Sequence, residues 1–221
     1  MYASSRRDLI VDAAIDLAET RDWESIRLHE VATRLGISLD DIRAEFSEKD
    51  QVVDAWFDRA DHAMLTDAAD SAARELSCQQ RLHRALMAWL NALASHRKVT
   101  RQMLLGKLEP GHIHIQIPGL MRISRTVQWL REAAGYDAGF PKRAVEETVH
   151  TGIYLTTFSY WMFDDSLHSE RTAQFLQNQL QRADFIFKCR HDRASVKDAE
   201  HPNRDYSSNN QAATGQTDTT G

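Results

Sequence analysis

The feature that most constrains the fold is a glycine between two short amphipathic patterns at residues 25–46. The apolar residues before it have helical spacing and are Ile26, Leu28, Val31, Ala32 and Leu35. Gly36 stands where helices often end with a positive φ, which glycine adopts without strain. Ser38 and Asp41 then have the spacing of a capping box, which opens a second helix. The sequence therefore predicts a helix-turn-helix, in which two short helices meet at a tight turn.

Helical periodicity extends on both sides of this motif. Residues 5–20 have an apolar face opposite a row of aspartates, and a second cap pattern at Ser47 predicts a long helix after the motif. Further apolar stripes between residues 79 and 188 predict more helices. Residues 112–117 alternate with period two, but no other segment offers a strand partner, so we expect an extended connector there. The predicted fold class is all-α, with an N-terminal three-helix helix-turn-helix domain followed by a C-terminal helical domain.

Composition and short motifs exclude several classes of protein. Of the 221 residues, 42% are hydrophobic and 27% are charged, which is typical of a globular chain. No apolar run approaches the ~20 residues that span a bilayer, and the N-terminus lacks the apolar core of a signal peptide. Cys78 and Cys189 are isolated, which fits a reducing cytoplasm. We see no phosphate loop, catalytic constellation or metal-ligand spacing, so we expect a cytoplasmic protein that is not an enzyme and has no cofactor or metal.

The run from Asp8 to Val53 resembles the N-terminal domain of the tetracycline-repressor (TetR) family of transcriptional regulators. The residues that carry the likeness are Ala13, Ala14, Ile26, Val31, Ala32, Gly36, Ile37, Ser38, Ile42, Phe46 and Lys49. The resemblance implies a DNA-binding domain at residues 1–50 and a ligand-binding and dimerisation domain at 51–190. It also implies a homodimer that represses transcription until a small molecule releases it from double-stranded operator DNA. Residues 191–221 are expected to form a disordered tail, since from about residue 199 the chain lacks Ile, Leu, Val, Phe and Met.

The predicted recognition helix departs from the family in its charge. Residues 38–46 contain three acids and one arginine, and residues 1–50 contain seven Lys or Arg against twelve Asp or Glu. Because affinity for DNA rests on neutralising phosphates, this balance opposes DNA binding. A second, shorter resemblance links residues 160–176 to the C-terminal helices of the lipid-binding accessory protein of ubiquinone biosynthesis. The alternative function is therefore a TetR-fold lipid-binding or accessory protein that has lost DNA binding.

Two sets of candidate site residues follow from the resemblance. The candidate DNA-binding residues are Arg27, Ser38, Leu39, Asp40, Asp41, Arg43, Ala44 and Lys49. The candidate pocket residues for an apolar or amphipathic ligand are Trp89, Met103, Trp129, His150, Tyr154, Phe158 and Trp161. We expect Arg43 and Lys49 to contact phosphates, and the helices at 143–163 and 168–188 to form the dimer interface.

Overall fold

The structure is a computed structural model that describes residues 5–107, 113–137, 139–140 and 142–199. The helices are α1 (Arg6–Thr20), α2 (Leu28–Leu35), α3 (Leu39–Glu45), α4 (Lys49–Ala68), α5 (Ser71–Arg74), α6 (Cys78–Leu93), α7 (Arg97–Lys107), α8 (Ile113–Ala134), α9 (Lys142–Trp161) and α10 (Glu170–Ala199). Short 3-10 helices occupy Trp23–Ser25, Ala94–His96 and Leu167–Ser169. The described residues contain no strand, which confirms the all-α prediction.

The chain divides into two compact units, residues 1–180 and 181–221. The first unit contains every helix up to the beginning of α10, and the second contains the rest of that helix. The tail predicted from residue 191 is helical as far as Ala199, and its remainder lies outside the described residues.

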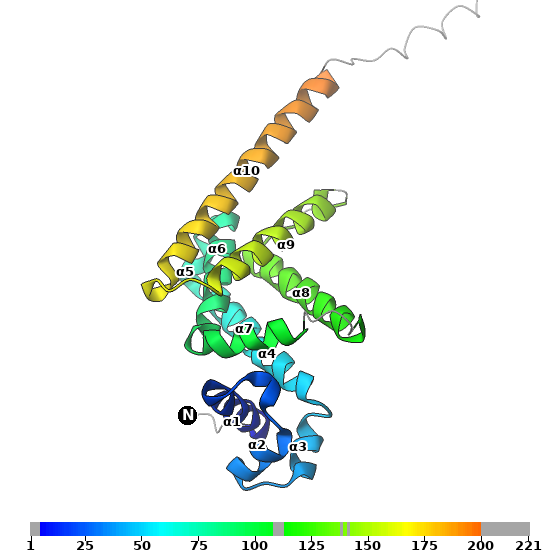
Figure 1. Cartoon of the computed structure of the whole chain (residues 1–221). Helices are drawn as coiled ribbons and strands as arrows, with labels where there is room; N and C mark the ends of the chain where they lie inside the picture. Colours follow the sequence, from blue (N-terminus) through cyan, green and yellow to red (C-terminus); the bar gives the residue numbers. More distant parts are fainter. Residues whose placement is uncertain (1–4, 108–112, 138, 141, 200–221) are drawn as a thin grey trace, which may run out of the picture. The chain divides into compact units, whose positions relative to one another are not determined.

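The helix-turn-helix forms as its local sequence predicts, and α1, α2 and α3 lie together in Figure 1. Gly36 ends α2 with a φ of 66°, and its N–H donates to the carbonyls of α2. Ser38 Oγ accepts from the N–H of Asp41 at 3.1 Å, and the Asp41 carboxylate accepts from the N–H of Ser38 at 3.0 Å, so the predicted capping box is confirmed. Phe46 is 1% exposed beneath the guanidinium of Arg7.

Two local predictions are wrong. The N-cap of α4 is Glu48 and not Ser47, and it forms no side-chain cap hydrogen bond, whereas the N–H of Ser47 donates to the side chain of Gln51 at 2.9 Å. The connector predicted at residues 112–117 is helical from Ile113 onward, as the first turn of α8. Alternation over six residues is compatible with a helix as well, because residues four apart, such as Ile113 and Ile117 in this sequence, also have helical spacing.

The C-terminal helices pack around α4 and α6, which contact each other and α8, while α9 packs against α8 and α6. The turn from α9 into α10 is held by Asp164, whose carboxylate accepts from the N–H of Ser166 and of Thr172, each at 2.9 Å. Burial opposes ionisation of Asp164, yet the hydrogen bonds from Ser166 and Thr172 lower its pKa to about 2. The carboxylate therefore stays charged and caps the beginning of α10.

Candidate functional site

The exposed face of α3 contains the side chains that the sequence predicts to meet DNA. Leu39, Asp40, Arg43 and Ala44 are all exposed, and Leu39 shows 54% of its surface. Ile42 and the following Phe46 point inward and are buried, so they hold the helix on α1 and α2. A short helix anchored on one side and open on the other can enter a major groove.

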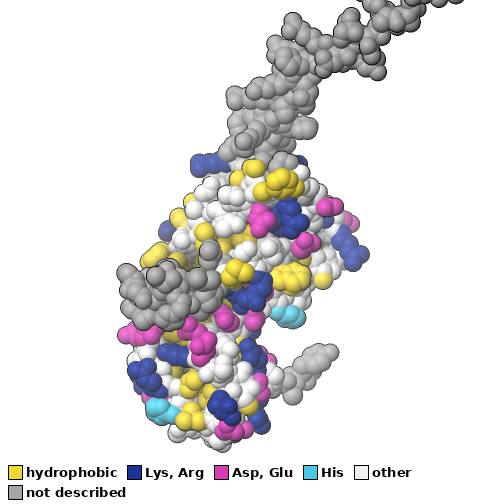
Figure 2. All heavy atoms as spheres, turned by 90° about the vertical axis from the view of Figure 1, so that its right-hand side faces the viewer, with side chains coloured by type: hydrophobic (Ala, Val, Ile, Leu, Met, Phe, Trp, Pro, Cys, Tyr) yellow, Lys and Arg dark blue, Asp and Glu magenta, His cyan; other side chains and the backbone are white. Residues whose placement is uncertain are grey.

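Two of the three acids of α3, Asp40 and Asp41, are paired with arginines of the same domain. Arg43 donates through Nε and NH2 to Asp40 Oδ1 at 3.0 and 2.9 Å, and Arg6 donates to Asp41 at 3.0 Å. The hydrogen bonds of Ser38, with a smaller contribution from Arg6, lower the pKa of Asp41. Both signs of charge are accordingly intermixed in the lower part of Figure 2, where the N-terminal helices lie. The surface is thus a set of ion pairs and not a uniform acidic patch.

The two other predicted cations also have partners within the protein. Lys49 Nζ donates to the carbonyl of Trp23 at 2.5 Å and lies 4.8 Å from the centre of its ring. Partial burial lowers the pKa of Lys49. Arg27 is exposed and donates through NH1 to the carbonyl of Glu24 at 2.9 Å. Lys49 therefore ties the beginning of α4 to the turn before α2, a structural use that its spacing in the sequence does not indicate.

The helix-turn-helix is connected to the C-terminal helices through α7. Gln102 accepts from the N–H of Trp23 at 3.1 Å and donates to the carboxylate of Asp22 at 3.0 Å. Immediately before α7, in the 3-10 helix Ala94–His96, His96 lies 2.8 Å from the carboxylate of Glu19 at the end of α1. The side chain of α7 that joins it to α4 is Thr100, which accepts from Trp56 Nε1 at 2.9 Å. A displacement of α7 would therefore shift its contacts with the turn before α2 and with the end of α1.

Four of the predicted pocket residues form an aromatic cluster. Trp89 of α6 lies 5.4 Å from Tyr154 and 5.1 Å from Phe158 of α9, measured between ring centres. Trp161 stacks at 5.8 Å from Phe158. Phe57 of α4 closes the cluster at 5.8 Å from Trp89.

Of the other three predicted pocket residues, two are buried and one is exposed. Met103 is buried on α7, and His150 is buried on α9 with its ring 4.6 Å from that of Tyr136. Trp129 is 48% exposed on α8, because Val127 and Leu130 occupy the buried side of that helix. Trp129 therefore does not join the buried cluster.

A buried charge network beside the aromatic cluster was not predicted. Asp61 of α4 accepts from Trp89 Nε1 at 2.7 Å, from Arg122 NH2 at 3.1 Å and from Thr126 Oγ1 at 3.1 Å. Arg122 also donates to Asp58 at 2.5 Å. Burial, followed by the charge of Asp61, raises the pKa of Tyr154 above its usual range, so the phenol stays protonated. The sequence feature that could have predicted this network is Asp61 itself. It is a carboxylate four residues after Phe57 and three before Met64, which places it on the apolar face of α4.

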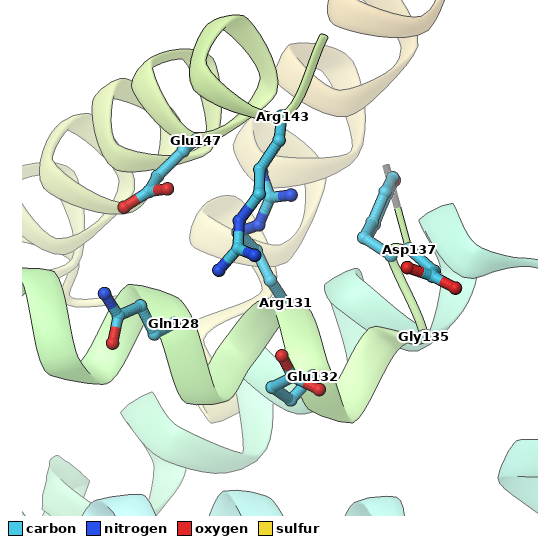
Figure 3. A pocket seen from close by; sticks show the side chains of 8 residues that line it. Gln128, Arg131, Glu132, Gly135, Asp137, Arg143 and Glu147 are labelled. Carbon is cyan, nitrogen blue, oxygen red and sulfur yellow. The ribbon is translucent and has the colours of Figure 1, made fainter. Parts of the chain in front are cut away.

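A polar cavity of about 280 Å³ opens between the end of α8 and the beginning of α9 (Figure 3). Its charged lining consists of Arg131, Glu132, Asp137, Arg143 and Glu147, with Gln128, Gly135 and Tyr136 completing the wall. Gly135 ends α8 with a φ of 72°, and a Cβ there would lie 2.8 Å from the guanidinium of Arg81. Arg81 donates to the carbonyl of Ala134 at 3.0 Å and so caps α8. The turn at this end of the cavity thus favours glycine for its φ, while a Cβ there would require the Arg81 guanidinium to shift.

Behind this cavity, charged and polar side chains are buried with incomplete partners. Arg131 NH2 lies 3.6 Å from Glu146 Oε2, and Glu146 Oε1 lies 3.5 Å from Lys142 Nζ. Among the described residues, Arg131 NH1, Glu146 Oε2 and His150 Nδ1 have no hydrogen-bond partner. Burial and the charge of Arg131 lower the pKa of His150 to about 4, so the imidazole is neutral at neutral pH. Sequence spacing could not show this group, because it joins residues of α8 and α9 across the turn.

Over the described part of the chain, no group of three or more His, Cys, Asp or Glu is arranged to hold a metal ion. None of the described helices is long and apolar enough to cross a membrane.

Comparison with solved structures finds bacterial transcription factors of the same architecture. The crystal structure of the TetR transcriptional regulator from Nitrosomonas europaea is 52% identical to this chain, covers 81% of it and 98% of its own length, and superposes with a TM-score of 0.73. A TetR transcriptional regulator from Rhodococcus sp. RHA1 is 16% identical, covers 78% of this chain and 92% of its own, and has a TM-score of 0.59. At that identity the second likeness shows the fold alone. No family model and no curated protein matches the chain.

Proposed function

The chain belongs to the TetR family of transcriptional regulators, and we propose from this premise that it binds operator DNA as a homodimer and represses transcription until a small molecule releases it. The observation that carries the proposal is the 52% identity to the Nitrosomonas europaea regulator over nearly the whole of that protein. The domain division predicted above, with residues 1–50 for DNA and 51–190 for ligand and dimer, is part of the same proposal.

In this proposal α3 enters the major groove with its exposed face toward the bases. Arg43 then has a phosphate within reach of the helix end, and it exchanges part of its pairing with Asp40 for that contact. The side chain of Arg43 is 77% exposed and that of Asp40 is 79% exposed. Because exposed ion pairs contribute only ~0.2–1 kcal/mol, breaking this pair costs little free energy. Asp40 is freed to accept from cytosine N4, which a carboxylate can do in the major groove.

The dimer is proposed to form through the outward side of α9 and the beginning of α10. The apolar side chains exposed on α9 and the turn after it are Val145, Leu155, Tyr160, Phe163 and Leu167. A Cβ at Gly152 would meet nothing within 4 Å, so a second helix can approach closely there. A two-fold axis beside α9 would bury this surface and would present two copies of α3 to one face of DNA.

Release from DNA is proposed to run through α7. The aromatic cluster alone would favour an apolar or amphipathic ligand, whereas the cavity between α8 and α9 is lined by charges. A ligand that prefers one arrangement of the C-terminal helices shifts the population toward it. Gln102 and His96 would pass that shift to the turn before α2 and to the end of α1.

The test is salt-titrated binding of the purified protein to the DNA that flanks its own gene. Arg43→Ala should weaken binding to all sequences alike and lower the slope of log K against log salt by about one. Arg74→Ala, which changes an exposed arginine on α5, is the matched control and should leave both quantities unchanged. Absence of binding at low salt in the unmodified protein would contradict the proposal. The TetR-fold lipid-binding or accessory alternative would then be the better one, in keeping with the paired arginines around α3.

A further inference from the structure

We propose that the cavity between α8 and α9 binds a small zwitterion, a molecule with one carboxylate and one ammonium group, as free amino acids have. The inference deepens the proposed function, and it rests on that function only in treating the bound molecule as the effector. It is carried by two converging arginines, by carboxylates in the same wall and by buried polar atoms that lack partners.

The carboxylate would bind between Arg131 and Arg143. The Arg131 side chain is only 6% exposed, and its NH1 has no hydrogen-bond partner among the described residues. A buried donor without an acceptor is unfavourable, so an oxygen supplied by a ligand would satisfy it. Arg143 extends from α9 toward α8 into the same space (Figure 3), and no described residue forms an ion pair with it. Two guanidinium groups facing one space suit a carboxylate, which accepts in a bidentate manner.

The ammonium group is required by the acids that share the wall. Glu132, Asp137 and Glu147 all line the cavity, so a simple anion would meet three carboxylates against two arginines. A simple cation would in turn meet the two arginines. A ligand with both charges can place its carboxylate on the arginines and its ammonium toward Glu147, which lies on α9 one turn beyond Arg143.

The size and polarity of the cavity restrict the ligand further. A volume of about 280 Å³ holds roughly nine waters at ~30 Å³ each, which is the scale of an amino acid. Among the described residues, the lining contains no Leu, Ile, Val, Met or Phe, so this wall does not favour a long apolar chain. His150 lies behind Arg131 as a neutral imidazole and adds no third positive charge at neutral pH.

The experiment uses the purified full chain and the twenty standard amino acids as probes. Each is first screened for an increase in the melting temperature, and positives are measured by titration calorimetry. We expect one or a few to bind, with the matching amine that lacks the carboxylate and the matching acid that lacks the ammonium each at least about tenfold weaker. Arg143→Ala should weaken binding by a similar factor. Arg125→Ala, an exposed arginine of α8 outside the cavity wall, should leave it unchanged.

The outcomes separate this inference from the proposed function. The zwitterion site is overturned if none of the amino acids binds. It is also overturned if Arg143→Ala leaves the affinity unchanged, or if the acid that lacks the ammonium binds equally well. Operator binding without ligand is measured on the same preparation. Intact operator binding with no amino-acid binding overturns this inference alone, whereas amino-acid binding that depends on Arg143 without operator binding supports the site and contradicts the proposed function.

Discussion

Removing the carboxylate of Asp61 should destabilise the protein far more than removing that of Asp58, although both pair with Arg122. The two residues lie one turn apart on α4, at 3.1 Å and 2.5 Å from the same guanidinium. Their side chains differ in exposure, at 12% for Asp61 and 55% for Asp58. The comparison therefore contrasts a buried carboxylate, which also accepts from Trp89 and Thr126, with an exposed one on the same guanidinium.

The expected magnitude follows from the groups left behind. Trp89 and Thr126 are each 1% exposed, and both donate to Asp61. Asp61→Ala therefore leaves the indole N–H of Trp89 and the hydroxyl of Thr126 buried without an acceptor. An unsatisfied buried donor costs about 1–3 kcal/mol, and breaking a buried ion pair costs about 3–5 kcal/mol. Since Arg122 keeps Asp58, we expect a loss of about 3–5 kcal/mol in total. Asp58→Ala should cost less than about 1 kcal/mol, as exposed ion pairs do.

The assay is equilibrium unfolding in urea, followed by tryptophan fluorescence at a fixed protein concentration, so that any dimer contributes equally. Added salt should weaken the effect of Asp58→Ala and leave that of Asp61→Ala nearly unchanged, because exposed pairs are screened and buried ones much less. Equal losses in the two variants, or a loss below about 1 kcal/mol for Asp61→Ala, would refute the argument that burial makes this carboxylate essential.

Three other predictions concern the core, the pH dependence and the dimer. Phe46→Ala should lower the free energy of unfolding by about 3–5 kcal/mol, because it leaves a cavity under α3, while Leu39→Ala on the exposed face should change it by less than about 0.5 kcal/mol in the same urea titration. The unfolded chain should bind a proton at His150 with the ordinary pKa of 6.5 and the folded protein only near pH 4, so stability should be full above pH 6.5 and fall between pH 6.5 and 4. The fall is on the order of 3 kcal/mol for this group, and His150→Gln should flatten it; an identical pH profile in that variant would show that the imidazole is not responsible. Light scattering should give about twice the 25.3 kDa chain mass at micromolar concentration, and Leu155→Glu on the exposed side of α9 should give the monomer; a monomeric unmodified protein would contradict the interface.

The sequence by itself determined the features that depend on residues close together in the chain. The end of α2 at Gly36, the cap of α3 at Ser38 and the buried position of Phe46 all follow from spacings of a few residues. Backbone N–H groups at a helix end must find acceptors nearby, so the local sequence decides where such a helix begins. The two local errors occurred where the same residues fit two structures. Either Ser47 or Glu48 can precede the first turn of α4, and the alternating residues before Pro118 fit a helix as well as an extended segment.

Only the tertiary structure decided which polar side chains are buried together. Asp61 meets Arg122 across 61 positions of the chain, Arg131 meets Glu146 across the turn between α8 and α9, and Trp129 faces outward although it is aromatic. Helical periodicity assigns a residue to a face, but it does not say which face of another helix will lie opposite. A buried charge is tolerated only where the packing supplies its partner. Such pairs can therefore be identified only when the positions of the helices are known.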